Sequence, residues 1–144
     1  MSTGVWPRGA AGLAQTTVAD AMHQGVFSCP RGASLAEVAS LMAARRVHAV
    51  VVLDDAAKDD SLWGVISDLD LVAAATVRDL ETQTAGGTAA SPALRVEPDD
   101  TLQHAAQVMT EHGAAHLIVV DSAGRPFGVL STLDIADALA ELHS

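Results

Sequence analysis

The sequence predicts an α/β fold made of two similar subdomains, and two observations support this prediction. First, the block Thr17–Leu71 recurs as Thr84–Ile135, at a shift of 67 positions that falls to 64 after a shorter turn. Second, each block alternates between apolar residues at helical spacing and short β-branched runs, in the order strand, helix, strand, strand, helix. A block of about 55 residues buries little surface alone. The two copies are therefore expected to share one core about a pseudo-twofold axis.

The division along the chain follows from the same repeat. Residues 1–16 are rich in Gly, Ala and Ser and have no clear period, so we expect them to form a tail. Residues 17–81 are the predicted first subdomain. Residues 82–144 are the predicted second subdomain, which includes a Gly- and Ala-rich linker at 82–91.

In the first copy, the opening helix carries the clearest local signal. Ser34 and Glu37 have the spacing of a capping box, in which a hydroxyl and a carboxylate satisfy free backbone amides at the start of a helix. Apolar residues then recur at helical spacing as far as Met42. Apolar and β-branched runs before and after this helix predict strands. The predicted elements of this copy are strands at 26–30, 50–53 and 62–66 and helices that begin at Ser34 and Ser67.

The second copy repeats these elements with one weaker helix cap. Thr101 replaces the capping serine, and His104 stands where the first copy has Glu37, so only half of the capping box is expected. The predicted elements of this copy are strands at 93–96, 117–120 and 126–130 and helices that begin at Thr101 and Ser131.

Composition and charge limit the possible functions. The chain has 144 residues, 49% of them hydrophobic, which is typical of a folded domain. Its apolar runs are too short to span a bilayer, its N-terminus lacks the layout of a signal peptide, and its single cysteine forms no internal disulfide, so we expect a cytoplasmic protein. The net charge of −10 argues against a nucleic-acid surface and against binding to anionic membranes.

The motif Ser-x-x-Asp occurs once in each copy, as Ser67 with Asp70 and as Ser131 with Asp134. Each serine ends a strand, and each aspartate lies in the first turn of the following helix. One interpretation is a capping box that satisfies backbone amides. The other is a ligand site, because helix amides and a hydroxyl bind anions and a nearby carboxylate accepts the two hydroxyls of a ribose.

The duplicated pattern resembles a tandem pair of cystathionine-β-synthase (CBS) domains, the Bateman module, over nearly all of residues 17–142. The resemblance lies in the opening helices and in two strand blocks, Arg46-Val-His-Ala-Val-Val-Val-Leu-Asp and Ala114-Ala-His-Leu-Ile-Val-Val-Asp. It also lies in the ends Trp63-Gly-Val-Ile-Ser-Asp-Leu-Asp-Leu and Phe127-Gly-Val-Leu-Ser-Thr-Leu-Asp-Ile.

This resemblance implies a regulatory pocket for AMP, ADP, ATP or S-adenosylmethionine, with no other cofactor. It implies that each Ser-x-x-Asp serine lies near phosphate, that each aspartate holds ribose, and that backbone groups at 26–29 and 93–96 read adenine. Arg46 and His48, just before the buried strand, match positions that meet phosphate, whereas the second copy offers only His116 there. The implied ligand-binding residues are Ser28, Arg46, His48, Ser67, Asp70, His116, Ser131 and Asp134.

The unequal basic residues predict unequal sites. The ribose-holding motif occurs twice, but the basic pair Arg46 and His48 occurs once. We therefore expect one better nucleotide site, in which Ser131 and Asp134 hold the ribose and Arg46 and His48 meet the phosphate.

The expected function is that of a stand-alone sensor that is not an enzyme. Binding of the adenosine-type ligand would change the geometry of the module and act on an effector protein in trans or within a homodimer. The helices after Ser67 and Ser131 are rich in small apolar residues, which allow close packing in such a dimer. One alternative is a dimerising adaptor with vestigial clefts. Another is a small enzyme, for which the pocket offers only Ser, Asp and one His as acid–base groups.

Two groups of possible metal ligands have structural interpretations. His112 and His116 have a spacing that binds zinc on a helix, but the helix is expected to end near Gly113, which would point them apart. The acidic run 54–60 lacks the ligand spacing and the glycine of a calcium loop and is expected to be a solvated turn.

The remaining candidates are also interpreted structurally. Cys29 has no adjacent histidine and no second cysteine, so we expect a small buried strand residue rather than a nucleophile. Trp63 is expected to fill the edge of the core. His23, His104 and His143 are expected to be ordinary surface or capping residues.

Overall fold

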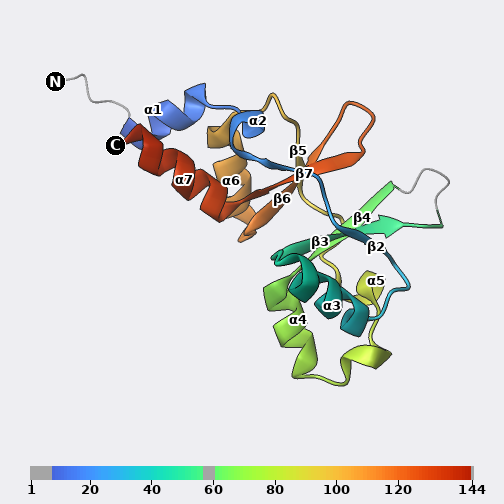
Figure 1. The fold of residues 1–144 in the computed structure, drawn as a ribbon. Helices are drawn as coiled ribbons and strands as arrows, with labels where there is room; N and C mark the ends of the chain where they lie inside the picture. The colour runs from blue at the N-terminus through green and yellow to red at the C-terminus, as the bar shows by residue number, and fades with distance from the viewer. Residues whose placement is uncertain (1–7, 57–60, 144) are drawn as a thin grey trace. The chain divides into compact units, whose positions relative to one another are not determined.

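The computed structural model describes residues 8–56 and 61–143 and divides the chain into two compact units (Figure 1). Unit 1 consists of residues 1–25, 95–123 and 127–144, and unit 2 consists of residues 26–94 and 124–126. Among the described residues, no helix has both the length and the apolar character needed to cross a membrane.

Unit 2 contains the body of the first repeat. Its sheet has the order β2-β3-β4, with β2 parallel and β4 antiparallel to β3, and α3 and α4 lie together beside it (Figure 1). Ser34 Oγ accepts a hydrogen bond from the Glu37 amide at 3.1 Å and so caps α3. The elements are β2 (Ser28–Pro30), α3 (Leu35–Arg45), β3 (Ala49–Asp54), β4 (Ser61–Ser67), α4 (Asp68–Ala75), the 3-10 helix η1 (Leu80–Thr82) and α5 (Ala85–Thr88).

Unit 1 contains the body of the second repeat. Its sheet has the order β1-β7-β6-β5, and the Thr101 Oγ1 that caps α6 accepts from the His104 amide at 3.1 Å. The order strand, helix, strand, strand, helix is confirmed in both repeats. The elements are α1 (Arg8–Gln15), α2 (Val18–Ala21), β1 (His23–Gln24), β5 (Arg95–Val96), α6 (Leu102–His112), β6 (His116–Val120), β7 (Pro126–Ser131) and α7 (Thr132–Leu142).

The tail expected before residue 17 is a helix over residues 8–15, so this prediction is wrong there. Helix α1 contacts α6 and α7, and its Leu13 is buried. The Gly- and Ala-rich composition hid the helix, because glycine is a weak helix former and alanine carries little apolar surface. Packing against two neighbouring helices supplies the stability that so short a helix lacks alone.

Each unit takes its leading helix from the other repeat. In unit 1 the amide of Val18, at the start of α2, donates to the carbonyl of Asp100 at 2.8 Å. In unit 2 the amide of Ala85, at the start of α5, donates to the carbonyl of Ala33 at 2.8 Å. Both pairs are related by the repeat shift of 67 positions. The compact units therefore follow a different division from the sequence repeats.

The core of each unit is made by its central strands and its first long helix. Leu35, Val38, Val50, Val52 and Ile66 form the centre of the cluster in unit 2. In unit 1 the corresponding fully buried residues are Leu102, Ala105, Leu117, Val119 and Leu130. The two scaffolds are closely equivalent, which makes differences at their polar ends informative.

Candidate functional site

Both Ser-x-x-Asp motifs form complete capping boxes. In unit 2, the amide of Ser67 donates to Asp70 Oδ2 at 2.8 Å, and the amide of Asp70 donates to Ser67 Oγ at 3.2 Å. In unit 1, the amide of Ser131 donates to Asp134 Oδ2 at 2.8 Å, and the amide of Asp134 donates to Ser131 Oγ at 3.1 Å. The structural interpretation of the motif is therefore correct, and each box leaves the serine hydroxyl proton available to donate.

The two carboxylates differ at their second oxygen. Asp134 is buried, and its Oδ1 lies 2.9 Å from Nδ1 of His23. Asp70 is half-buried, and its Oδ1 has no hydrogen-bond partner among the residues that the structure describes. One carboxylate is thus engaged on both oxygens, while the other keeps a free acceptor.

His23 reaches Asp134 from a different part of the chain. It lies on β1, which pairs antiparallel with β7 so that His23 faces Val129. His23 is exposed, as expected of a surface residue, since 79% of its side chain is accessible. Its contact with Asp134 was not predicted from the sequence. The one signal in the sequence is the alignment of the two repeats, in which Ala90 occupies the position equivalent to His23.

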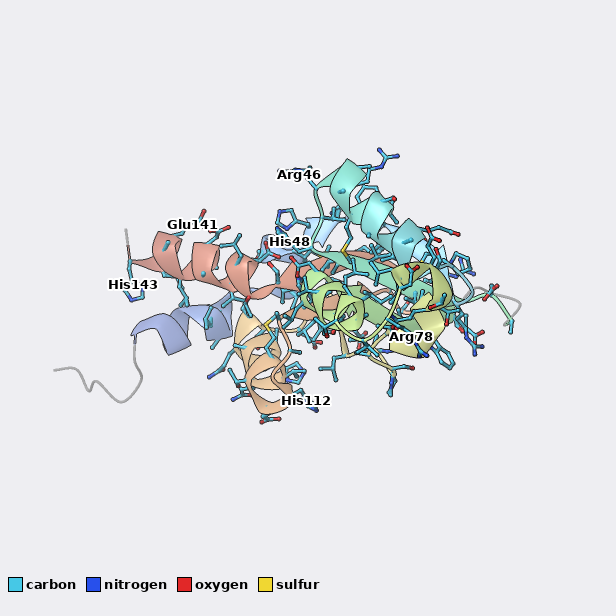
Figure 2. The ribbon with its side chains drawn as sticks, turned by 90° about the horizontal axis from the view of Figure 1, so that it is seen from below. Arg46, His48, Arg78, His112, Glu141 and His143 are labelled. Carbon is cyan, nitrogen blue, oxygen red and sulfur yellow. The ribbon has the colours of Figure 1, made fainter. Side chains whose placement is uncertain are left out.

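The basic pair predicted before the buried strand lies in unit 2. Figure 2 shows Arg46 and His48 close together where α3 ends and β3 begins. Arg46 is exposed and takes a left-handed conformation, with φ 55° and ψ 45°, which ends the helix. Nδ1 of His48 lies 2.8 Å from Oδ2 of Asp68, and the carbonyl of His48 accepts from the Asp68 amide at 2.9 Å.

The structure groups the predicted residues by unit. Arg46 and His48 share unit 2 with Ser67 and Asp70, at the end of the sheet where Ala49 pairs with Ser67. The other predicted residues, His116, Ser131 and Asp134, belong to unit 1. The basic pair is therefore adjacent to the Ser-x-x-Asp motif of its own repeat.

Ser28 lies farther along the same sheet of unit 2. A hollow of about 210 Å³ is lined by Ser28, Cys29, Pro30, Leu53 and Asp55. Leu53 and Asp55 are at the opposite end of β3 from the strand residue that pairs with Ser67. Because a strand rises by about 3.3 Å per residue, Leu53 is about 13 Å along β3 from Ala49, while Ser28 pairs with Val51, about 7 Å from Ala49.

Cys29 is a buried strand residue, as predicted. Burial, with a smaller contribution from the charge of Glu37, raises the pKa of its thiol from 9.0 to about 11. A thiol with such a pKa is neutral near pH 7 and is a poor nucleophile.

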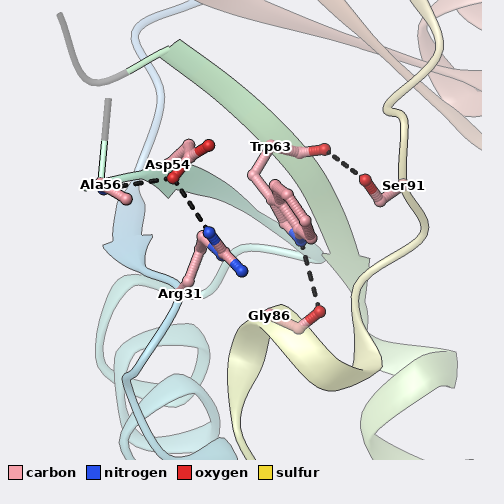
Figure 3. A network of polar contacts seen from close by, with 6 residues as sticks. All are labelled: Arg31, Asp54, Ala56, Trp63, Gly86 and Ser91. Carbon is pink, nitrogen blue, oxygen red and sulfur yellow. Dashed lines mark hydrogen bonds and ion pairs between the residues drawn. The ribbon is translucent and has the colours of Figure 1, made fainter. Parts of the chain in front are cut away.

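A polar network at the turn after β3 holds Trp63 in place (Figure 3). The guanidinium of Arg31 lies 3.9 Å from the centre of the Trp63 ring, and Arg31 Nη1 lies 3.1 Å from Oδ1 of Asp54. The Trp63 indole donates to the carbonyl of Gly86 at 3.3 Å. Trp63 packs against the core cluster, which confirms its predicted structural role, while residues 57–60 of the acidic run lie outside the described part of the chain.

His112 and His116 lie on different elements, as the predicted helix end requires. Helix α6 ends at His112, Gly113 follows with φ 61°, and His116 begins β6. Nδ1 of His112 pairs with the carbonyl of Val108 at 2.9 Å. Within residues 8–56 and 61–143, no three His, Cys, Asp or Glu side chains form a group that could hold a metal ion.

Comparison with known sequences identifies one family. The family model of the CBS domain matches two segments of the chain, residues 18–76 and 88–141. Hypoxic response protein 1 of Mycobacterium tuberculosis is 31% identical over 128 residues, which make up 88% of this chain and 87% of that protein. A solved structure of Hypoxic Response Protein I with two coordinated zinc ions is 29% identical, with a TM-score of 0.70, and the match covers 85% of this chain and 98% of that one.

Two other solved structures share the fold. CBSX2 in complex with AMP has a TM-score of 0.74 at 24% identity, over 90% of this chain and 99% of that chain. A CBS domain pair in complex with 5′-methylthioadenosine and S-adenosyl-L-methionine has a TM-score of 0.78 at 19% identity, over 88% of this chain and 97% of that chain. These likenesses confirm the predicted fold class.

Proposed function

The chain belongs to the CBS domain family, and from this premise we propose that it is a regulatory module that binds an adenosine-containing ligand. The ligand class is AMP, ADP, ATP or S-adenosylmethionine. Solved structures of related CBS proteins in complex with AMP and with S-adenosyl-L-methionine support this class. The module carries out no reaction of its own, and its output is a change in geometry.

The observation that carries the proposal is the free acceptor at Asp70. Its Oδ2 is fixed by the Ser67 amide, so the carboxylate has a defined orientation while Oδ1 remains available for a ribose hydroxyl. The Ser67 hydroxyl accepts from the Asp70 amide and can still donate its proton to a ligand oxygen. A rigid carboxylate beside a hydroxyl donor is the pair of groups that a ribose phosphate needs.

The neighbouring basic groups suit the phosphate or another acidic part of the ligand. Arg46 is exposed and makes no ion pair with another described residue. The His48 imidazole is held by Asp68 at the first residue of α4, next to Ser67. In a chain of net charge −10, the Arg46 guanidinium provides a local positive charge that favours an anion, and the His48 imidazole offers a ring nitrogen for a hydrogen bond.

The signal is proposed to pass through a homodimer or to an effector protein in trans, in the cytoplasm. Leu69 and Val72 on α4 and Leu133 on α7 are large apolar side chains that are 72%, 63% and 65% exposed. Leu69 and Leu133 occupy equivalent positions of the repeat. Burial of such side chains against a second copy would stabilise a dimer by removing apolar surface from water.

A dimerising adaptor with vestigial clefts is the alternative. It is favoured by the capping boxes, because amide satisfaction alone accounts for the serine and aspartate of each motif. An adaptor of this kind would bind no nucleotide and would keep the exposed apolar helices for its partner.

Calorimetric titration with AMP, ATP and S-adenosylmethionine tests the proposal. Wild-type protein should bind at least one of them, and Asp70→Ala should weaken binding at least tenfold. Asp20→Ala is the matched control, because Asp20 is also the aspartate of a capping box, with Thr17 on α2, but it is not part of the proposed site. Wild-type protein that binds none of the three compounds would contradict the proposal and favour the adaptor.

A further inference from the structure

His23 and Asp134 contact each other in unit 1. Asp134 Oδ2 accepts from the Ser131 amide, and Oδ1 lies 2.9 Å from His23 Nδ1. Only 4% of the Asp134 side chain is accessible to solvent, whereas 79% of the His23 side chain is accessible. A carboxylate is an acceptor only, so Nδ1 must carry the proton in this contact. The imidazole is therefore the exposed donor to a buried carboxylate.

Strand pairing sets the position of His23. β1 lies against β7, where the carbonyl of Phe127 accepts from the Gly25 amide at 2.7 Å. Gly128 allows this approach, because a Cβ at that residue would lie 3.0 Å from the carbonyl oxygen of His23. The pairing of β1 with β7 thus positions the His23 side chain beside Asp134, the last residue of the Ser-x-x-Asp motif.

The same backbone contact occurs in unit 2 without an imidazole. Ala90 stands 67 positions after His23 and bridges Val65, which is the residue equivalent to Val129. The Ala90 amide donates to the Val65 carbonyl at 3.0 Å, and the Val65 amide donates to the Ala90 carbonyl at 3.2 Å. The methyl side chain of Ala90 has no donor for Asp70. The two sites therefore share a backbone frame and differ in one side chain.

We infer that His23 determines which of the two equivalent carboxylates binds the ribose. It occupies Asp134 Oδ1, so a ligand diol must displace the imidazole in unit 1, whereas Asp70 in unit 2 is open. This inference rests on the proposed function, because it concerns the same adenosine-type ligand. It assigns the tighter site to Asp70 and makes His23 a specificity-determining residue.

Calorimetry with AMP tests this assignment. Asp70→Asn isolates the Asp134 site, and adding His23→Ala to that variant should tighten AMP binding about three- to tenfold, because the competing hydrogen bond is lost. The reciprocal change Ala90→His in the wild-type background should weaken binding by a similar factor, since Ala90 is exposed and has room for an imidazole. With 2′,3′-dideoxy-AMP, which has no ribose hydroxyls to compete, neither change should alter binding.

The control is His104→Ala, which removes an exposed histidine from α6. Thermal melts verify that each variant is folded, and Ala90→His tests the inference independently if His23→Ala is unstable. If wild-type protein binds AMP but neither His23→Ala nor Ala90→His differs from His104→Ala, the role of His23 is overturned and the proposed function stands. If neither the wild type nor any variant binds AMP, both the role of His23 and the proposed function are contradicted.

Discussion

The two units are most alike in their backbones and least alike at the two aspartates of the repeated motif. Ser67 with Asp70 and Ser131 with Asp134 each make the same two hydrogen bonds, at distances between 2.8 and 3.2 Å. His23 adds a contact at 2.9 Å to Asp134, and Ala90 adds none to Asp70. A motif match therefore says where a carboxylate lies, but not whether it is free to bind.

The same comparison leads us to propose a main site that differs from the one predicted from the sequence. The sequence predicted Ser131 and Asp134 as the ribose holders, with Arg46 and His48 on the phosphate. Within unit 2 the basic pair lies with Asp70, and within unit 1 His23 contacts Asp134. Both the free carboxylate and the basic groups thus favour unit 2 as the main site in the proposed function.

The largest expected effect is on the free energy of unfolding, and it concerns the buried core, in which the two units are alike. Ile66 and Leu130 are equivalent strand residues, and both are fully buried. Replacing either with alanine should lower the free energy of unfolding by about 2–5 kcal/mol, through lost burial and the cavity left behind. Urea denaturation measures both losses. A loss at one position only would show that the scaffolds are not equivalent.

The next largest effect is on AMP binding, and it concerns Asp70 and Asp134, at which the two units differ. Asp70→Ala should weaken AMP binding at least tenfold, or about 1.4 kcal/mol. Asp134→Ala should change it less than about threefold in the wild-type background, because His23 already occupies this carboxylate. Calorimetry on both variants, with Asp20→Ala as the control, separates the two. Equal losses would remove the asymmetry between the sites.

Alkaline pH distinguishes the units through Cys29, whose equivalent in the second repeat is Val96. The unfolded thiol ionises above pH 9.0, while the folded thiol, with a pKa of about 11, stays neutral, so stability should fall between these values. The loss should reach about 1 kcal/mol at pH 10. The chain contains no tyrosine and one lysine, so few other groups titrate in this range. Cys29→Val should flatten the pH profile of the melting temperature; an unchanged slope would contradict the prediction.

The smallest expected effect concerns the network around Trp63, which the second repeat does not reproduce. Pro98 stands where the first repeat has Arg31, so the ion pair and the ring contact of Arg31 have no counterpart in unit 1. Arg31→Ala should lower the free energy of unfolding by about 0.5–1 kcal/mol, since the group is partly exposed. Arg78→Ala, at an exposed arginine, is the control for loss of charge. Indistinguishable denaturation midpoints for the two variants would mean that the network adds no stability.

The sequence alone determined the elements and the family. The repeat, the periodicity of its apolar residues and its helix caps depend on neighbours within about four positions, and local spacing is enough to read them. The same local rule located both Ser-x-x-Asp boxes and the end of α6 at Gly113. It missed helix α1, whose Gly- and Ala-rich sequence gives a weak local signal for a helix.

Tertiary structure alone decided which residues meet across large separations. His23 and Asp134 are far apart in the chain, and they meet because β1 adds to the sheet of the other repeat. Each unit contains the leading segment of the other repeat for the same reason. Such pairing depends on backbone groups that every sequence carries. The sequence thus determined that there are two equivalent carboxylates, and the pairing of β1 with β7 decided that, among the described residues, Asp134 has a histidine partner and Asp70 has none.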